Sequence, residues 1–106
     1  MTTCSTHVLD AVAGRPAPGQ DVALLAADGT VLEQGSTDTD GRLHWSTALA
    51  TGTYGMRFAT AEWFAAAGVA TVHAAVHLEV LVDGSQPHYH LALLLSPFAF
   101  TTYRGS

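Results

Sequence analysis

Alternation of apolar and polar residues is the dominant pattern along this chain, and it predicts β-strands. The clearest example covers residues 71–82, where Val, Ala and Leu occupy one face and His, Thr and Glu fall mostly on the other. A period of two over that length indicates a strand, because an amphipathic helix repeats every 3.6 residues. Shorter apolar or alternating runs predict seven further strands, at residues 5–12, 21–27, 30–33, 42–45, 54–58, 87–95 and 98–104.

Residues 61–67 break the alternation and predict one short helix. The alanines in this segment favour a helix, Thr60 is expected to cap its N-terminus, and Gly68 is expected to end it. Turn-forming Asp-Gly pairs separate several of the predicted strands. About eight short strands with one helix predict an all-β protein, an antiparallel β-sandwich that forms a single domain over residues 1–106.

Composition and charge exclude several functions. Hydrophobic residues make up 48% of the 106 residues, enough for a packed core, and the net charge is −5. Without a basic cluster, nucleic acid and anionic membranes are not expected partners. The chain has no lysine, which excludes Schiff-base chemistry and a P-loop.

The single cysteine and the absence of long apolar runs indicate where the protein works. Cys4 cannot form an internal disulfide or a cysteine-based zinc cluster, and it fits a reducing compartment. No apolar run approaches the roughly 20 residues of a membrane span, and no basic and apolar leader is present at the N-terminus. We therefore expect a soluble intracellular protein, with the cytoplasm as the default.

Six histidines are many for a chain of this length, and most have a plain explanation. His73 and His77 share a face but lie roughly 13 Å apart along a strand, too far for joint chelation, so a solvated sheet face is expected. His44, beside Trp45, is expected to have a structural role.

The segment His88-Tyr89-His90 is more informative. Two residues apart on a strand, the histidines share a face at a spacing of roughly 7 Å. They could bind zinc with a third ligand from elsewhere, lie exposed to solvent, or act as metal-free acid and base. If the leucines that share the face of Tyr89 enter the core, His90 points outward among apolar neighbours. A titratable group on such a face indicates a cavity or a subunit interface.

The C-terminal residues offer a second candidate. Arg104 follows an aromatic strand near the end of the chain. A frayed tail is one interpretation. The other is a binding role, since arginine carries a rigid five-donor fork suited to planar anions or the carbonyls of a heterocycle.

Together, these motifs resemble the transthyretin-like family, including its enzyme branch, the 5-hydroxyisourate hydrolases. Order and spacing fit from residue 4 to residue 106. The segments that carry the resemblance are Ser5-Thr6-His7-Val8-Leu9-Asp10, Gly14-Arg15-Pro16-Ala17, Asp38-Thr39-Asp40-Gly41-Arg42, His88-Tyr89-His90 with Leu93-Leu94-Leu95-Ser96-Pro97, and Thr102-Tyr103-Arg104-Gly105-Ser106.

The resemblance implies a prealbumin-like sandwich and hydrolysis of 5-hydroxyisourate without a metal or other cofactor. It implies His7, Arg42 and His90 as catalytic residues, with His7 the expected base and Arg42 orienting the substrate. It also implies a homotetramer with active sites at a dimer–dimer interface. The terminal residues implied to bind substrate, with Arg104 and Ser106 closing the pocket, are Tyr103, Arg104, Gly105 and Ser106.

Two departures from the family pattern and two alternatives remain. Leu91-Ala92 replaces the usual x-Pro after the second histidine, and Val72-His73-Ala74-Ala75 replaces an aromatic-Pro motif. Neither change touches a candidate catalytic side chain. One alternative is a carrier of aromatic hormones, although a carrier channel has no use for two histidines and an arginine together. The other is a zinc hydrolase built on His88 and His90.

Overall fold

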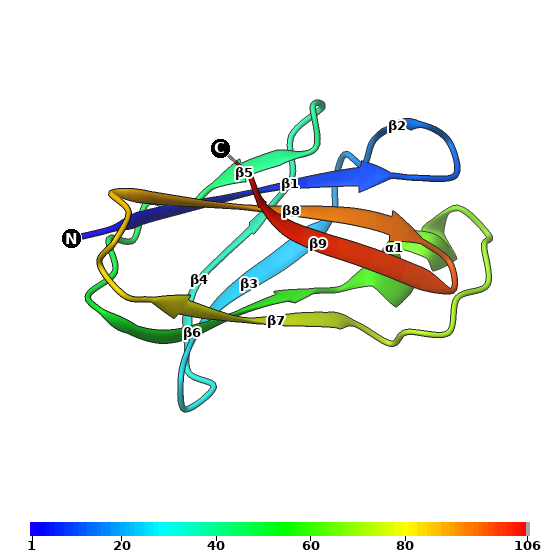
Figure 1. The fold of residues 1–106 in the computed structure, drawn as a ribbon. Coiled ribbons are helices and arrows are strands. Elements are labelled where there is room, and N and C mark those ends of the chain that lie inside the picture. The colour runs from blue at the N-terminus through cyan, green and yellow to red at the C-terminus, as the bar shows by residue number, and fades with distance from the viewer. Residues whose placement is uncertain (106) are drawn as a thin grey trace.

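The computed structural model describes residues 1–105 as two β-sheets packed face to face, with one helix at an end of the sandwich (Figure 1). The elements in chain order are β1 (Thr3–Asp10), β2 (Arg15–Pro16), β3 (Asp21–Ala26), β4 (Val31–Ser36), β5 (Arg42–His44), β6 (Gly52–Phe58), α1 (Thr60–Ala66), β7 (Val76–Val82), β8 (His88–Ser96) and β9 (Ala99–Gly105). The prediction of an all-β sandwich with one short helix is confirmed.

Strand order determines which residues can meet. One sheet has the order β2-β1-β8-β9, with β5 pairing with β1 as well, and the other has the order β4-β3-β6-β7. All pairs are antiparallel except β1 with β8, which run parallel in a register that joins Ser5 to His90. The sequence pattern had predicted antiparallel strands only, because alternation shows which residues share a face and says nothing of a distant strand's direction.

The core lies between the two sheets and is filled by the alternate residues that the pattern indicated. Met56 and Phe58 of β6 are buried, as are Leu93 and Leu95 of β8. Tyr89 is buried on the same side as these leucines, which leaves His90 on the outer face. The leucine face enters the core, so the condition under which His90 was expected to point outward is met.

Two strand predictions were too long. Residues 71–75 form no strand, and Val72, expected on the same strand face as Val76, is 64% exposed because β7 begins only at Val76. The first strand ends at Asp10, after which the chain turns toward Gly14, whose positive φ suits glycine. Val12, expected on the same strand face as Val8, is therefore exposed, whereas Val8 is buried.

The predicted capping of the helix was also wrong. Ala59 occupies the N-cap position, and no side chain caps α1. Thr60 is the first helical residue, and its buried hydroxyl has no partner among the described residues. Gly68 adopts a positive φ just beyond the helix, as expected for a helix end. No helix within residues 1–105 has the length and apolar character to cross a membrane.

Candidate active site

Strand register brings the three candidate catalytic residues together on the outer face of the five-stranded sheet. His7 of β1 pairs with Arg42 of β5 on one side and with Ala92 of β8 on the other. His90 stands two residues before Ala92, on the same face. The ring centroids of His7 and His90 are 6.3 Å apart. Residues 7, 42 and 90, distant in the chain, therefore face one another around a single small area.

The His7 ring is oriented by the turn before β5. Its Nε2 lies 2.9 Å from the backbone carbonyl of Asp40. A carbonyl only accepts hydrogen bonds, so Nε2 carries the hydrogen and the neutral ring presents a free lone pair at Nδ1. That nitrogen is the atom at which His7 can take a proton.

Asp38 organises the same turn and supplies negative charge. Its carboxylate accepts hydrogen bonds from the backbone N–H groups of Asp40 and Arg42. The bond from Arg42, with the nearby charges of Arg42 and His7, lowers the pKa of Asp38 despite some desolvation. An ionised Asp38 balances the cationic groups that gather here.

His90 is half-buried and has a partner on β1. Its Nδ1 lies 2.7 Å from the Ser5 hydroxyl. Burial lowers the pKa of His90, and the positive charges of His7 and Arg42 lower it further, with smaller effects from His88 and His44. A neutral His90 is thus favoured at neutral pH.

The C-terminal strand closes this face on the far side of His90. Gly105 pairs directly with His90, and a Cβ at position 105 would lie only 2.6 Å from Cδ2 of the His90 ring. Glycine is required here because the ring covers the space that any side chain would occupy. Tyr103 pairs with Ala92 and is half exposed on the same face.

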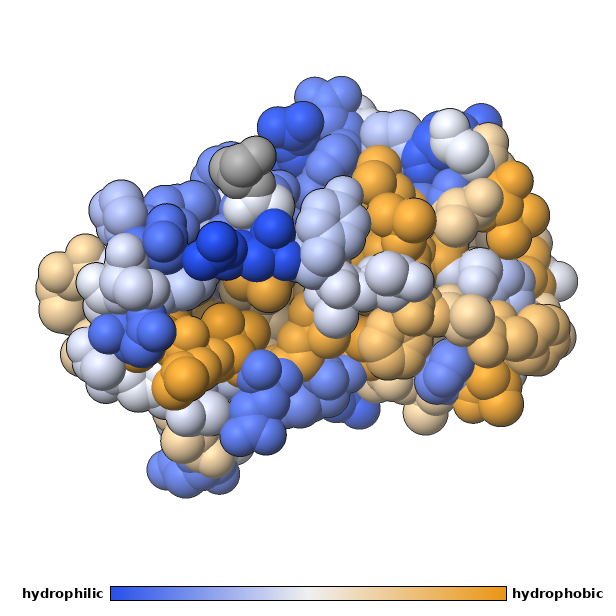
Figure 2. Space-filling model, viewed as in Figure 1, coloured by the Kyte–Doolittle hydropathy of each residue, from blue (hydrophilic) through white to orange (hydrophobic). Residues whose placement is uncertain are grey.

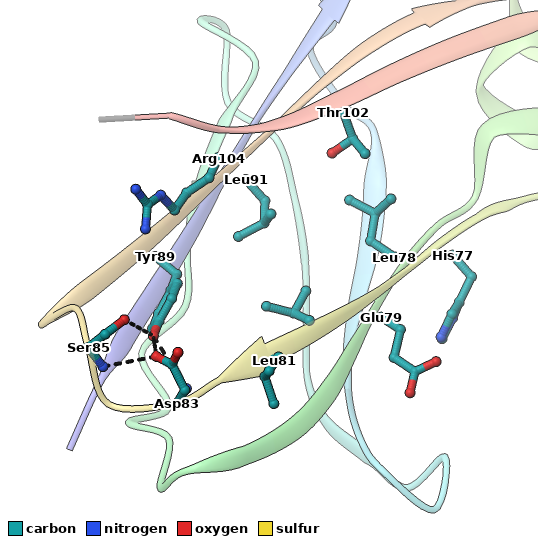
Figure 3. A pocket seen from close by; sticks show the side chains of 11 residues that line it. His77, Leu78, Glu79, Leu81, Asp83, Ser85, Tyr89, Leu91, Thr102 and Arg104 are labelled. Carbon is teal, nitrogen blue, oxygen red and sulfur yellow. Dashed lines mark hydrogen bonds between the residues drawn. The ribbon is translucent and has the colours of Figure 1, made fainter.

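Arg104 lies on the opposite side of β9. It pairs with Leu91, an inward-facing residue, and its side chain lines a hollow of about 460 Å³ between β9 and β7 (Figure 3). We call this the β7–β9 hollow; Figure 2 shows apolar residues gathered between more polar ones in the gap below β9. The structure thus brings Tyr103 and Gly105 to His90 and leaves the Arg104 side chain elsewhere. Ser106 lies outside the described residues.

Two of the remaining histidines lie near the four-stranded sheet and two on the outer face of the five-stranded sheet. His77 is exposed on β7, as expected for a solvated face, whereas His73 packs edge-on against Phe100. His44 and His88 lie near each other on the outer face, with ring centroids 6.1 Å apart. No group of three or more His, Cys, Asp or Glu side chains suited to a metal ion occurs within residues 1–105.

Ser5 contacts the site, and reasoning from the sequence gave it no role there, whereas His88 was considered with His90 as a zinc ligand or as an acid and base. Ser5 lies within hydrogen-bond distance of both His88 and His90. The link depends on the parallel register of β1 and β8, which no local pattern reveals. We call the outer-face group Ser5, His7, Arg42, His88 and His90 the histidine face.

The comparisons with known proteins decide the family. A model of the HIUase/Transthyretin family matches residues 4–105. The chain belongs to this family. The 5-hydroxyisourate hydrolase of Salmonella dublin is 38% identical over 108 residues, which cover 96% of this chain and 79% of that relative.

Solved structures of the HIUase/Transthyretin family include two close in shape to this chain. The 5-hydroxyisourate hydrolase of Klebsiella pneumoniae has a TM-score of 0.91 at 38% identity, covering 100% of this chain and 94% of that one. Sea bream transthyretin in complex with thyroxine has a TM-score of 0.88 at 31% identity, covering 96% and 93%. The prealbumin-like fold is confirmed, and the names of the curated relatives place the chain among the hydrolases of the family.

Proposed function

We propose that this protein hydrolyses 5-hydroxyisourate to 2-oxo-4-hydroxy-4-carboxy-5-ureidoimidazoline, a step of urate degradation. The observation that carries the proposal is the convergence of His7, Arg42 and His90 through the pairing of β1 with β5 and β8. Relatives at 38% identity named for this reaction support the substrate. In the reaction, water attacks a ring carbonyl, a C–O bond forms, and the ring C–N bond breaks.

His7 is the base in this proposal. Its Nε2–H is committed to the Asp40 carbonyl, so Nδ1 is the nitrogen free to take the proton of the attacking water. Because a carbonyl cannot donate, this contact holds the ring in the tautomer that a base needs. A positioned base typically contributes ~10²–10⁴-fold to a rate.

Arg42 orients the substrate and stabilises the negative charge that develops on the attacked carbonyl oxygen. Its exposed guanidinium stands beside His7 and presents several donors in one plane. Donors placed where charge develops supply a large share of catalysis, because no reorganisation is needed as the reaction proceeds. The Asp38 carboxylate, which accepts a hydrogen bond from the backbone of Arg42, supplies a nearby counter-charge.

His90 completes the reaction by giving a proton to the departing ring nitrogen. The lowered pKa of His90 favours the neutral ring, and in this proposal the hydrogen that it transfers is on Nε2, the nitrogen that does not face Ser5. Tyr103 and Gly105 form the edge of the pocket in this proposal. Arg104 contributes there through its backbone, since its side chain lines the β7–β9 hollow.

We also propose that the protein assembles as a homotetramer, with active sites at the dimer–dimer interface. Support comes from exposed apolar side chains on the edge strands: Leu81 of β7 is 67% exposed, and Phe100 and Tyr103 of β9 are also exposed. Such residues beside unpaired strand edges are typical of surfaces that pair with another chain. A buried, free Cys4 is compatible with the cytoplasm as the compartment.

The alternative within the family is a carrier of small aromatic ligands. Similarity to a transthyretin that binds thyroxine supports it. The histidine face argues against it, because binding an aromatic ring needs no base that is held in one tautomer beside a guanidinium. Thyroxine binding without any hydrolysis of 5-hydroxyisourate would favour the carrier.

The deciding experiment follows the ultraviolet decay of freshly generated 5-hydroxyisourate with and without the protein. We expect the protein to accelerate the decay, and Arg42→Ala to reduce kcat by roughly 10²–10³-fold, as for loss of one preorganised donor to a developing anion. Activity that persists in a strong chelator would dispose of the zinc alternative. A decay rate equal to that of buffer alone would contradict the proposed function.

A further inference from the structure

Ser5 joins two histidines that lie on the same strand. Its hydroxyl oxygen is 2.7 Å from Nε2 of His88 and 2.7 Å from Nδ1 of His90. Nδ1 of His88 in turn lies 2.6 Å from the hydroxyl of Thr3. These contacts form an unbroken chain of hydrogen bonds from the half-buried His90 ring to the exposed residues His88 and Thr3.

The valences of these groups restrict how hydrogens can be placed along the chain. A hydroxyl donates one hydrogen, and a neutral imidazole has one donor and one acceptor nitrogen. If Ser5 donates to His90, it accepts from Nε2–H of His88, and both rings carry hydrogen on Nε2. If Ser5 donates to His88, both rings carry hydrogen on Nδ1. The two histidines are therefore coupled, with the same nitrogen protonated on each.

Uncoupled arrangements cost free energy because Ser5 is only 1% exposed. If both rings donated to Ser5, its own hydroxyl hydrogen would be buried without a partner among the described residues. If both rings presented lone pairs, one nitrogen would face the oxygen at 2.7 Å without a hydrogen between them. Either case leaves a buried polar group unsatisfied, which native structures avoid.

We propose that Ser5 and His88 are a proton relay that serves His90, coupling the hydrogen on its Nε2 to the exposed ring of His88. The role of the relay in turnover rests on the proposed function, whereas the coupling of the two rings rests on geometry alone. Ser5 and His88 are thus positioning residues, since they act through His90. Both stand on the histidine face, one on each of the parallel strands.

Each step of the relay conserves protons. As Nε2 of His90 gives its hydrogen to the departing ring nitrogen, Nδ1 of His90 takes the hydroxyl hydrogen of Ser5. Ser5 takes the hydrogen from Nε2 of His88, and Nδ1 of His88 takes one from the Thr3 side, where solvent replaces it. The relay resets when protonated His7 returns its extra proton, through water in the pocket, to Nε2 of His90 and the same shifts run backward.

The surroundings of His90 keep the relay neutral. Cationic and titratable groups face it from three strands: His7 from β1, Arg42 and His44 from β5, and His88 from β8 itself. From β9, the backbone of Gly105 lies against the ring and brings no charge. Since imidazolium rings donate from both nitrogens, protonation of either histidine would stop the relay. Activity is therefore expected to fall on the acid side of the pH profile.

The coupling is tested without substrate by ¹⁵N NMR of the histidine rings. In the wild-type protein we expect His88 and His90 to carry hydrogen on the same nitrogen. In Ser5→Ala we expect the Nδ1 signal of His90 to lose its hydrogen-bond shift, and the tautomers of the two rings to become independent. Opposite tautomers in the wild type, or signals unchanged in Ser5→Ala, would overturn the proposal.

Kinetics test the relay itself, with His88→Gln as the sharper variant because the His88 side chain is exposed. A glutamine can keep one hydrogen bond to Ser5, but its amide cannot pass a proton from one atom to another. We expect kcat to fall roughly 10-fold or more, within the ~10²–10⁴-fold that a positioned acid or base supplies, while KM stays unchanged. A wild-type kcat in His88→Gln would refute transfer through His88.

His44→Gln is the matched control. His44 also lies near His90 and lowers its pKa, yet within residues 1–105 no hydrogen bond connects His44 to Ser5, His88 or His90. We expect His44→Gln to shift the acid limb of the pH profile of kcat slightly and to leave the maximal kcat of that profile unchanged. If the wild-type protein showed no hydrolysis while the rings remained coupled, the proposed function would fail and the coupling would stand.

Discussion

The histidine face and the β7–β9 hollow flank the same strand, β9, and they differ in what their polar groups do. On the histidine face, ring nitrogens are held by Ser5 and by the Asp40 carbonyl, and a glycine makes room for a ring. In the hollow, aliphatic side chains separate His77 and Glu79 from a small cluster at Asp83 (Figure 3). Hydrogen bonds from Ser85 and Tyr89 hold the pKa of Asp83 well below its usual range.

The comparison shows that a hollow does not by itself indicate chemistry. The β7–β9 hollow has volume and an apolar lining, but its acidic group is committed to a turn. The histidine face instead combines an imidazole held by the Asp40 carbonyl, a second imidazole whose pKa is lowered, and a guanidinium. Preorganised donors and acceptors matter more for catalysis than an enclosed volume does. If this comparison is right, changes in the histidine face should affect activity far more than changes in the β7–β9 hollow.

The largest effect is expected from the two histidines. His7→Asn and His90→Asn should each lower kcat by roughly 10²–10⁴-fold, since each removes a proton-transfer group that water replaces poorly. The measurement is the decay of 5-hydroxyisourate across a pH series for each variant. If His7 is the base, His7→Asn should lose the acid limb of the pH profile of kcat, along which the base becomes protonated. Wild-type rates in both variants would remove the histidine face from the mechanism.

Gly105→Ala should have the next largest effect. The new Cβ would meet the His90 ring at 2.6 Å, so the ring must move, and displacement of a catalytic group by about 1 Å can cost roughly 10²-fold in rate. The matched control is Gly52→Ala in β6, where a Cβ would make only ordinary contact with Tyr54 at 3.7 Å. Equal activity in the two variants would show that the position of the His90 ring is unimportant.

A smaller effect is expected in stability against pH. The pKa of His90 is lowered by burial and by neighbouring positive charge, so below its unfolded value of about 6.5 the unfolded chain binds more protons than the folded one. The free energy of unfolding should therefore decrease as the pH falls through 6.5 toward the folded pKa. Denaturant unfolding from pH 7.5 to 5.5 measures this slope. His90→Asn should flatten it, and an identical slope would contradict the assigned cause.

The smallest effect is expected from the hollow. Arg104→Ala removes an exposed side chain and should change the free energy of unfolding by no more than about 0.5 kcal/mol. Its kcat/KM should remain far above that of Gly105→Ala, although the two positions are adjacent. A loss as large as that of Gly105→Ala would break the comparison, because it would mean that the Arg104 side chain reaches the substrate.

Local patterns predicted the sandwich and part of the site. The alternation from Val76 to Val82 and the inward leucines of β8 follow from burial on one face, which each segment records in its own sequence. The outward direction of His90 followed from the same argument. That His7, Arg42 and His90 act together was implied by the resemblance to the transthyretin-like family, because the alternation of apolar and polar residues does not show which distant residues meet.

Other features depended on neighbours that the sequence does not display. The hydroxyl of Ser5 gains its importance from the parallel register with β8, and the side of Arg104 follows from the pairing of Leu91 with that residue. Thr60 has the residue type of a cap, but the chain enters α1 one residue earlier. Val72 continues the apolar alternation of β7 in sequence only, since the strand begins at Val76.

The parallel pairing of β1 and β8 also bears on the order of folding during synthesis. Ser5 and His90 are separated by 85 positions, so the first long strand to leave the ribosome waits for almost the whole chain before its partner emerges. Contacts between such distant residues form slowly, because a large loop must close first. Until then β1 carries only His7 of the three histidines on the histidine face, so the proposed site cannot form before β8 is synthesised.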